Sequence, residues 1–290
     1  MLATGNEILA VANEHGFAVP AFNISSYSML HAVVDVCEEK RSPHIIAIHP
    51  DELAHTRADM LSSIIRIAHE SSVPTAIHLD HGASYEQVLW AIQCGFTSVM
   101  IDKSFVSFEE NVAQTRRVVE AAHAVGLSVE AELGTIGVSD KYGETGSEEI
   151  LYTDPEDAVR FIEATGADSL AIAIGTRHDL YPSEAKPALR LDLLEEIKSL
   201  LPIPLVLHGG TGIPTDQIKK AISMGVSKIN VNTDLQVAFA KATREFVVSG
   251  KDLEGKNYDP RKFLKPGFDA IVARTKELMV DFGSDGKGWA

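Results

Sequence analysis

The sequence predicts a closed α/β barrel of the (β/α)8 type with an additional C-terminal helix, and three observations support this. Short apolar strands alternate with amphipathic helical stretches along the chain, at roughly 30–35 residues for each strand–helix unit, the spacing of a βα repeat. Strands such as residues 169–174 are apolar at nearly every position, as expected in a parallel sheet buried on both faces. Eight consecutive units favour a barrel over a doubly wound open sheet, which is the alternative architecture.

The expected elements follow one another in a regular order. We expect strands at 17–22, 44–48, 74–79, 97–101, 127–133, 168–174, 203–207 and 226–231, and helices at 84–94, 108–125, 155–165, 191–200 and 214–224. Asp154 before Pro155 is typical of a capped helix start. Gly126, Gly166 and Gly225 are placed to end helices before the next strand. One more helix is expected near 268–281, and without a linker-like segment the chain is predicted to be a single domain, 1–290.

Composition and charge exclude several classes of protein. The chain has 290 residues, of which 45% are hydrophobic and 23% charged, and a net charge of -15, whereas a nucleic-acid surface needs a basic stripe. The two cysteines, Cys37 and Cys94, cannot form a disulfide framework and suggest a reducing compartment. Neither a signal peptide nor an uncharged apolar run of membrane-spanning length is evident. We therefore expect a cytoplasmic protein that binds neither nucleic acid nor membrane.

Polar side chains stand at or just beyond the end of every expected strand. They are Asn23, His49, Asp80 with His81, Asp102, Glu132, His178, His208 and Asn230. Because the parallel strands of a barrel all end on one face, these side chains should share one rim, where enzymes of this architecture place their active sites. The series predicts an active-site rim.

Three of these rim residues are histidines from different strands. His81, His178 and His208 follow the third, sixth and seventh strands, and three imidazoles with one open position are typical of a catalytic zinc site. Each alone is compatible with an ordinary rim histidine, but their joint placement favours a metal. His49 is ambiguous, and His78 is expected to support the rim. The remaining histidines are interpreted as surface residues: His15, His31, His44, His55, His69 and His123.

Asp80 is the expected acid/base group. Adjacent strand residues point to opposite faces, so Asp80 and His81 can both serve the site only where the strand curls into its loop. Gly82 is expected to allow that turn. The alternative is that Asp80 caps the following helix. Asp102 and Glu132 could hydrogen-bond the histidines and so orient them, or could serve as alternative metal ligands, although ion-pair or capping roles fit them equally well.

A glycine-rich turn follows the seventh strand, in His208-Gly209-Gly210-Thr211-Gly212-Ile213-Pro214. It leads into a helix N-terminus and offers backbone amides to an anion, and phosphate sites in such barrels recur after strands seven and eight. A plain strand–helix turn also contains glycines, but its position directly after a proposed metal ligand favours a phosphate site. The residues expected there are Gly209, Gly210, Thr211, Asn230, Val231, Asn232 and Thr233.

Together these motifs resemble the class II, zinc-dependent ketose-bisphosphate aldolases. The resemblance rests on residues 21–23, 78–82, 95–102, 129–134, 208–214 and 228–234, which include Ala21-Phe22-Asn23 and His78-Leu79-Asp80-His81-Gly82. It extends from about residue 15 to Phe282-Gly283-Ser284 and covers both the fructose- and the tagatose-bisphosphate branches.

The resemblance implies a TIM barrel with zinc on His81, His178 and His208. Zinc would polarise the C2 carbonyl of a ketose 1,6-bisphosphate as a Lewis acid, and Asp80 would take the C4 hydroxyl proton. The products would be dihydroxyacetone phosphate and an aldehyde such as glyceraldehyde 3-phosphate. Dihydroxyacetone phosphate would lie along 209–211 and 230–233, with Asn23 and Asp179 as further substrate-binding positions. Homodimers or homotetramers, and a monovalent cation (Na⁺ or K⁺) near the phosphate, are also implied.

Two positions depart from the pattern of that family. The residue after the second zinc histidine is usually glycine, but here it is Asp179, whose carboxylate would repel a phosphate unless Arg177 or a cation neutralises it. The loop after strand five usually carries Gly-Gly with an acidic pair in that family. Here the loop has Gly137-Val138-Ser139-Asp140 and then Glu144. The alternatives are therefore a noncatalytic partner or regulatory subunit, or an aldolase for a different phosphorylated sugar. A Schiff-base aldolase would have only Lys228 as its inner-barrel lysine.

Overall fold

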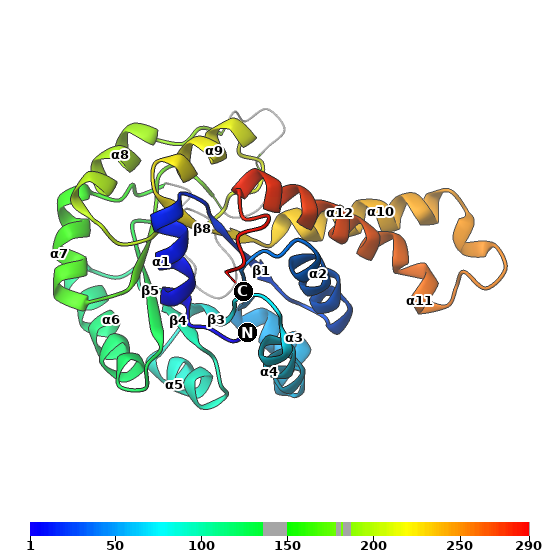
Figure 1. The fold of residues 1–290 in the computed structure, drawn as a ribbon, viewed down its shortest axis with the longest axis horizontal. Helices are drawn as coiled ribbons and strands as arrows, with labels where there is room; N and C mark the ends of the chain where they lie inside the picture. The colour runs from blue at the N-terminus through cyan, green and yellow to red at the C-terminus, as the bar shows by residue number, and fades with distance from the viewer. Residues whose placement is uncertain (136–149, 178–180, 182–186, 290) are drawn as a thin grey trace.

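The computed structural model describes residues 1–135, 150–177, 181 and 187–289. Within this part of the chain, eight parallel strands close into a barrel in which each strand pairs with its sequence neighbour and the last pairs with the first (Figure 1). The strands are β1 (Val19–Asn23), β2 (His44–Ile48), β3 (Thr75–Gly82), β4 (Ser98–Ile101), β5 (Ser128–Leu133), β6 (Ser169–Ile172), β7 (Leu205–Leu207) and β8 (Val226–Val231). The predicted barrel is confirmed, and the open sheet is excluded.

Helices surround the barrel and follow the predicted order. They are α2 (Tyr27–Glu39), α3 (Pro50–Thr56), α4 (Leu61–Glu70), α5 (Tyr85–Gln93), α6 (Phe108–His123), α7 (Pro155–Thr165), α8 (Leu191–Leu200), α9 (Thr215–Ser223) and α10 (Thr233–Val248), with short 3-10 turns at Ala58–Met60 and Lys251–Leu253. The five helices expected between 84 and 224 are confirmed, two of them with the predicted bounds. The main apolar core lies between the strands and these helices.

A helix that the sequence analysis did not predict closes the bottom of the barrel. This helix, α1 (Gly5–His15), packs against β8, β3 and β5. Its N-terminus is stabilised by a capping box in which Thr4 and Glu7 satisfy each other's backbone N–H groups. Ile8, Leu9 and Ala12 form a second, smaller apolar cluster with residues of β1, β2 and β3. The barrel is therefore filled from below by α1.

The C-terminal region holds more than the single helix expected there. The short α11 (Pro260–Phe263) precedes the long α12 (Lys265–Phe282), which packs along α10 and also against α2 and α9. Figure 1 shows α10, α11 and α12 extending outward from the barrel as one arm. The additional helix is confirmed, and it begins three residues before the expected start. In the described residues we find no helix whose length and apolar character would suit a membrane span.

Candidate active site

The end of β3 departs from regular strand geometry, which brings two adjacent side chains into the barrel mouth. β3 pairs in register with β4 up to Leu79 and again at Gly82, with a register shift between them. His81 has φ of 49°, in the left-handed region that non-glycine residues rarely adopt. Such bulges re-aim side chains beside active sites. The left-handed residue is therefore His81 and not Gly82, which corrects the expectation that Gly82 makes the turn. Glycine is needed at position 82 for a different reason: a Cβ there would lie 2.3 Å from the Met100 carbonyl oxygen.

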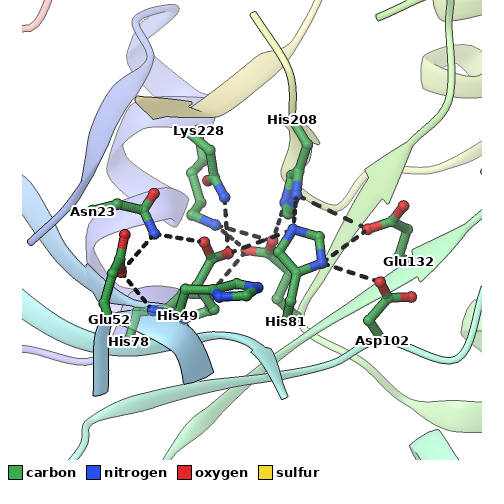
Figure 2. Close-up of polar contacts among 12 residues, drawn as sticks. Asn23, His49, Glu52, His78, His81, Asp102, Glu132, His208 and Lys228 are labelled. Atoms are coloured by element: carbon green, nitrogen blue, oxygen red, sulfur yellow. Dashed lines mark hydrogen bonds and ion pairs between the residues drawn. The ribbon is translucent and has the colours of Figure 1, made fainter. Parts of the chain in front are cut away.

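His81 and His208 bring two imidazole nitrogens face to face (Figure 2). Nδ1 of His208 lies 2.9 Å from Nε2 of His81. The other nitrogen of each ring contacts a carboxylate: His81 Nδ1 lies 3.0 Å from Asp102 Oδ2, and His208 Nε2 lies 2.9 Å from Glu130 Oε1. All four side chains are buried. A carboxylate behind each imidazole is the usual arrangement for histidines that ligate a metal.

This arrangement suits a metal ion better than it suits two histidines alone. Because carboxylates only accept hydrogen bonds, the outer nitrogen of each ring carries the hydrogen, and a neutral ring then presents a lone pair inward. Burial lowers the pKa of His208, which favours its neutral form. Two lone pairs 2.9 Å apart repel each other unless a cation shares them. An oxygen of Asp80 lies in the same group of potential ligand atoms, all within 4.8 Å of one another. The donor set therefore fits zinc.

The structure accounts for some of the predicted metal residues and not for others. His178 and Asp179 lie outside the described residues. Burial acts to raise the pKa of Asp102, but the hydrogen bond and the charge of His81 lower it to about 2. Glu132 lies 4.0 Å from Nδ1 of His81, and these two residues with Asp102 form a second group of potential ligands. Asp102 thus orients His81, and both of the roles considered for Asp102 and Glu132 are compatible with this geometry.

Glu130 is a site residue that the sequence analysis missed. Its side chain is buried inside the barrel, where it accepts hydrogen bonds from Lys228 Nζ through both oxygens, at 3.0 and 2.8 Å. Burial acts to raise the pKa of Glu130, but Lys228 and His208 hold it well below its usual range. A signal was available: Glu130 stands two residues before Glu132, so both side chains face the same side of the strand.

Replacing Glu130 is expected to weaken metal binding. Glu130→Gln leaves an amide that can present a donor to His208, and it removes the buried carboxylate that Lys228 contacts directly. Loss of such an outer partner typically costs 10–100-fold in metal affinity, so the Kd for zinc should rise by roughly that factor. Competition with a chromophoric chelator measures this. Glu86→Gln, on the exposed face of α5, is the control; an unchanged Kd in Glu130→Gln would show that Glu130 does not hold His208 for the metal.

Asp80 is held by two side-chain amides. Nδ2 of Asn23 donates to Oδ2 of Asp80, and Nδ2 of Asn230 donates to Oδ1, each at 2.9 Å. Burial acts to raise the pKa of Asp80, but the nearby histidines and Lys228 hold it well below its usual range, so the group is ionised at neutral pH. The capping alternative is wrong, because the hydroxyl of Ser84 caps α5 instead.

The two segments expected to hold phosphate lie together. Gly210, Thr211, Asn230 and Val231 line one cavity of about 30 Å³. Gly209 adopts a left-handed φ of 65°, and a Cβ there would lie 2.3 Å from the carbonyl oxygen of Arg177, so no other residue fits. Asn232 and Thr233 stand at the start of α10, where the first N–H groups of a helix lack internal partners. The arrangement is suited to an anion.

Among the other histidines, one interpretation is wrong and two are refined. His44 is not at the surface: it is fully buried in β2, and burial lowers its pKa to about 4. His49 caps α3, and its ring lies edge-on to that of His81 with centroids 5.9 Å apart. His78 is buried, with Nδ1 2.7 Å from Ser98 Oγ. His78, expected to support the rim, instead lies buried inside the barrel against Ser98 of β4, and His49 belongs to the rim.

Comparisons with known proteins identify the family of this chain. The family described as "Fructose-bisphosphate aldolase class-II" matches residues 3–287. A fructose-bisphosphate aldolase of Thermus caldophilus is 42% identical over 308 residues, covering 99% of this chain and 100% of the relative. One of Geobacillus stearothermophilus is 44% identical over 291 residues, covering 99% and 98%. The crystal structure of the YdjI aldolase from Escherichia coli K12 has a TM-score of 0.85 and 36% identity, covering 99% of this chain and 100% of that one. The chain belongs to the class II fructose-bisphosphate aldolase family.

Proposed function

We propose that this aldolase holds zinc with His81, His178 and His208 and uses Asp80 to move the C4 hydroxyl proton of a ketose 1,6-bisphosphate. The family establishes the reaction class, which is aldol cleavage of a ketose bisphosphate. The observation that best supports the residue roles is the pair of facing imidazole nitrogens, 2.9 Å apart, each ring backed by a buried carboxylate.

The proposed chemistry follows from the position and charge of Asp80. Breaking the bond between C3 and C4 requires the C4 hydroxyl to lose its proton while the bonding electrons move toward C2. Asp80 is ionised and fixed by Asn23 and Asn230, so it can accept that proton in cleavage and return it in condensation. When bound, zinc supplies a Lewis acid for the C2 carbonyl. Asn230 Oδ1 is buried without a partner in the described part of the chain and can accept a substrate hydroxyl.

The glycine turn would position the substrate through its phosphate. The backbone amides of 209–211, together with residues 230–233, would bind the phosphate of dihydroxyacetone phosphate and so align the C3–C4 bond with Asp80. The backbone of Arg177 packs against Gly209. Arg177 therefore stands next to the glycine turn, and its positive charge would favour a phosphate bound there. A monovalent cation, Na⁺ or K⁺, near the phosphate would offset the charge of Asp179.

Two alternatives are less well supported. A Schiff-base mechanism needs a free amine on an inner strand, but the Nζ of Lys228 donates to both oxygens of Glu130. A noncatalytic partner or regulatory subunit is suggested only by Asp179, while Asp80 and the two described histidines are in place. A different phosphorylated sugar is still compatible with Asp179, and the choice between fructose and tagatose depends on configuration at C4.

A substrate panel tests the proposal. The zinc-loaded protein is given the ketose 1,6-bisphosphates that differ at C4, together with shorter ketose phosphates, and release of dihydroxyacetone phosphate is followed by coupled reduction. We expect release from at least one bisphosphate, with no covalent adduct trapped by borohydride. Failure to cleave any member of the panel, with zinc bound, would contradict the proposal.

We further propose that the chain forms a homodimer or homotetramer and acts in the cytoplasm. The arm of α10, α11 and α12 exposes apolar side chains at Val248, Leu253 and Tyr258, which are 80%, 84% and 70% exposed. Apolar groups gathered on a projecting arm support self-association. Cys37 and Cys94 are both free, in accordance with a reducing compartment.

A further inference from the structure

Glu52 is a buried carboxyl group beside the proposed proton-transfer residue, and the reaction proposed for Asp80 does not use it. It lies in the first turn of α3, and it is only 7% exposed. Its Oε2 accepts hydrogen bonds from the backbone N–H of His49, at 2.7 Å, and from Nδ2 of Asn23, at 3.2 Å (Figure 2). Glu52 is thus connected to the site by a side chain of β1.

Helix capping accounts for only one of these two contacts. Glu52 completes a capping box with His49, as Glu7 does with Thr4 at the start of α1, where Oε2 lies 2.8 Å from the Thr4 backbone nitrogen. Glu7 makes the same box while exposed to solvent, so the cap does not require burial. Burying a carboxyl group costs free energy. It also raises the pKa of Glu52 to about 7, despite hydrogen bonds from His49 and Asn23 that lower it. A second role is needed to explain the burial.

The second contact passes through Asn23 to Asp80. Nδ2 of Asn23 donates both to Oε2 of Glu52, at 3.2 Å, and to Oδ2 of Asp80, at 2.9 Å. An amide NH₂ group has two hydrogens, so this pair of acceptors uses both of them. If residue 52 offered no acceptor, the amide of Asn23 could rotate by half a turn. It would then present its oxygen to the carboxylate of Asp80 and repel it.

We propose that Glu52 is a positioning residue that acts through Asn23 to keep the carboxylate of Asp80 oriented toward the C4 hydroxyl. This inference rests on the proton-transfer role proposed for Asp80. The role requires a hydrogen-bond acceptor at residue 52 but not a charge, because a protonated carboxyl group can still accept through one oxygen. Glu52→Gln should therefore preserve the function, and Glu52→Leu, which keeps the volume but removes the acceptor, should impair it.

Comparing two half-reactions tests this role specifically. Cleavage of the ketose bisphosphate needs proton transfer at the C4 hydroxyl. Exchange of the hydrogen on dihydroxyacetone phosphate, at the carbon that becomes C3, does not need it, because that substrate has no C4. Both rates are measured on zinc-loaded protein, with exchange followed by NMR in deuterated water. Relative to exchange, Glu52→Leu should lower kcat for cleavage by about 10–100-fold, a share of the 10²–10⁴-fold that acid–base groups contribute. Its KM should change little.

Matched variants separate positioning from capping. Glu52→Gln should keep the ratio of cleavage to exchange within about threefold of the original, since its amide oxygen can accept from Asn23. Glu7→Leu removes the capping box of α1, so it should lower the Tm without changing that ratio. If Glu52→Leu does not fold, Glu52→Met removes the acceptor with a more flexible side chain.

Asp80→Asn, measured in parallel, tests the proposed role of Asp80 independently of Glu52. It should lose cleavage and keep exchange; if it keeps cleavage, the proposed role of Asp80 fails and the inference fails with it. Suppose that Asp80→Asn behaves as expected but Glu52→Leu either lowers the cleavage and exchange rates equally or changes neither rate. Glu52 is then only a helix cap, and the inference fails. Equal damage from Glu52→Gln and Glu52→Leu would likewise overturn the inference, since the acceptor would then not be what matters.

Discussion

His208→Ala is expected to lose bound zinc and, with it, aldol cleavage. The substitution removes the nitrogen that faces Nε2 of His81 and leaves one oxygen of Glu130 without its imidazole partner. Lewis-acid polarisation is worth several kcal/mol in the transition state, so we expect kcat/KM to fall by at least about 10³-fold. Elemental analysis of the purified variant gives the metal content, and coupled release of dihydroxyacetone phosphate gives the activity.

The control for this variant is a histidine away from the rim. His69→Ala, exposed on α4, should keep both zinc and activity. A thermal melt should show that His208→Ala is folded, so that loss of metal is not loss of structure. Full zinc content together with full activity in His208→Ala would contradict the proposed metal site.

Asp80→Asn is expected to lower kcat for cleavage by about 10²–10⁴-fold while zinc remains bound. The amide has the same shape but cannot take up a proton. Its NH₂ group would also face a donor, either Asn23 or Asn230, where the carboxylate now accepts from both. Steady-state cleavage and metal analysis measure the two effects.

Asp80→Asn and His208→Ala should differ in their zinc content. Asp80→Asn should lose cleavage but keep zinc, whereas His208→Ala should lose both. Loss of zinc in Asp80→Asn would make Asp80 a metal ligand, because one of its oxygens lies in the same group of potential ligand atoms as His81 and His208. Unchanged cleavage would show that another group moves the proton.

The barrel could be predicted because its signals are local. Each apolar strand and each capped helix is readable within a few residues, and β2 and β8 begin and end where expected. The helix α1 was missed because its role is tertiary: it covers the barrel bottom, with Gly5 packed closely against Ser98 and Ser128. Its capping box, Thr4 with Glu7, was a local signal that could have identified it.

The site was predictable at the strand ends and not inside the barrel. Residues that follow a strand are recognisable as rim residues, so Asp80, His81 and His208 were identified. Glu130 lies within a strand and was not singled out, and Lys228 was considered only as a candidate Schiff-base lysine; only closure of the barrel shows that the two neutralise each other. The bulge at His81 depends on the register between β3 and β4, which sequence alone does not determine.

Glu52 illustrates a different limit. Its segment has the pattern of an ordinary helix start, with Pro50 in the first turn. Its approach to Asp80 depends on the order of β1, β2 and β3 around the barrel and on the side-chain rotamer of Asn23. The sequence contains Glu52, Asn23 and Asp80, but it does not show that their side chains lie within hydrogen-bonding distance of one another.

Zinc titration of metal-free protein tests the central claim most directly. The metal is removed with a chelator, the chelator is dialysed away, and release of dihydroxyacetone phosphate from the preferred ketose bisphosphate is measured as zinc is added back. We predict no release from the metal-free protein and an increase in proportion to zinc until about one ion is bound per chain. Full activity in metal-free protein would contradict the account.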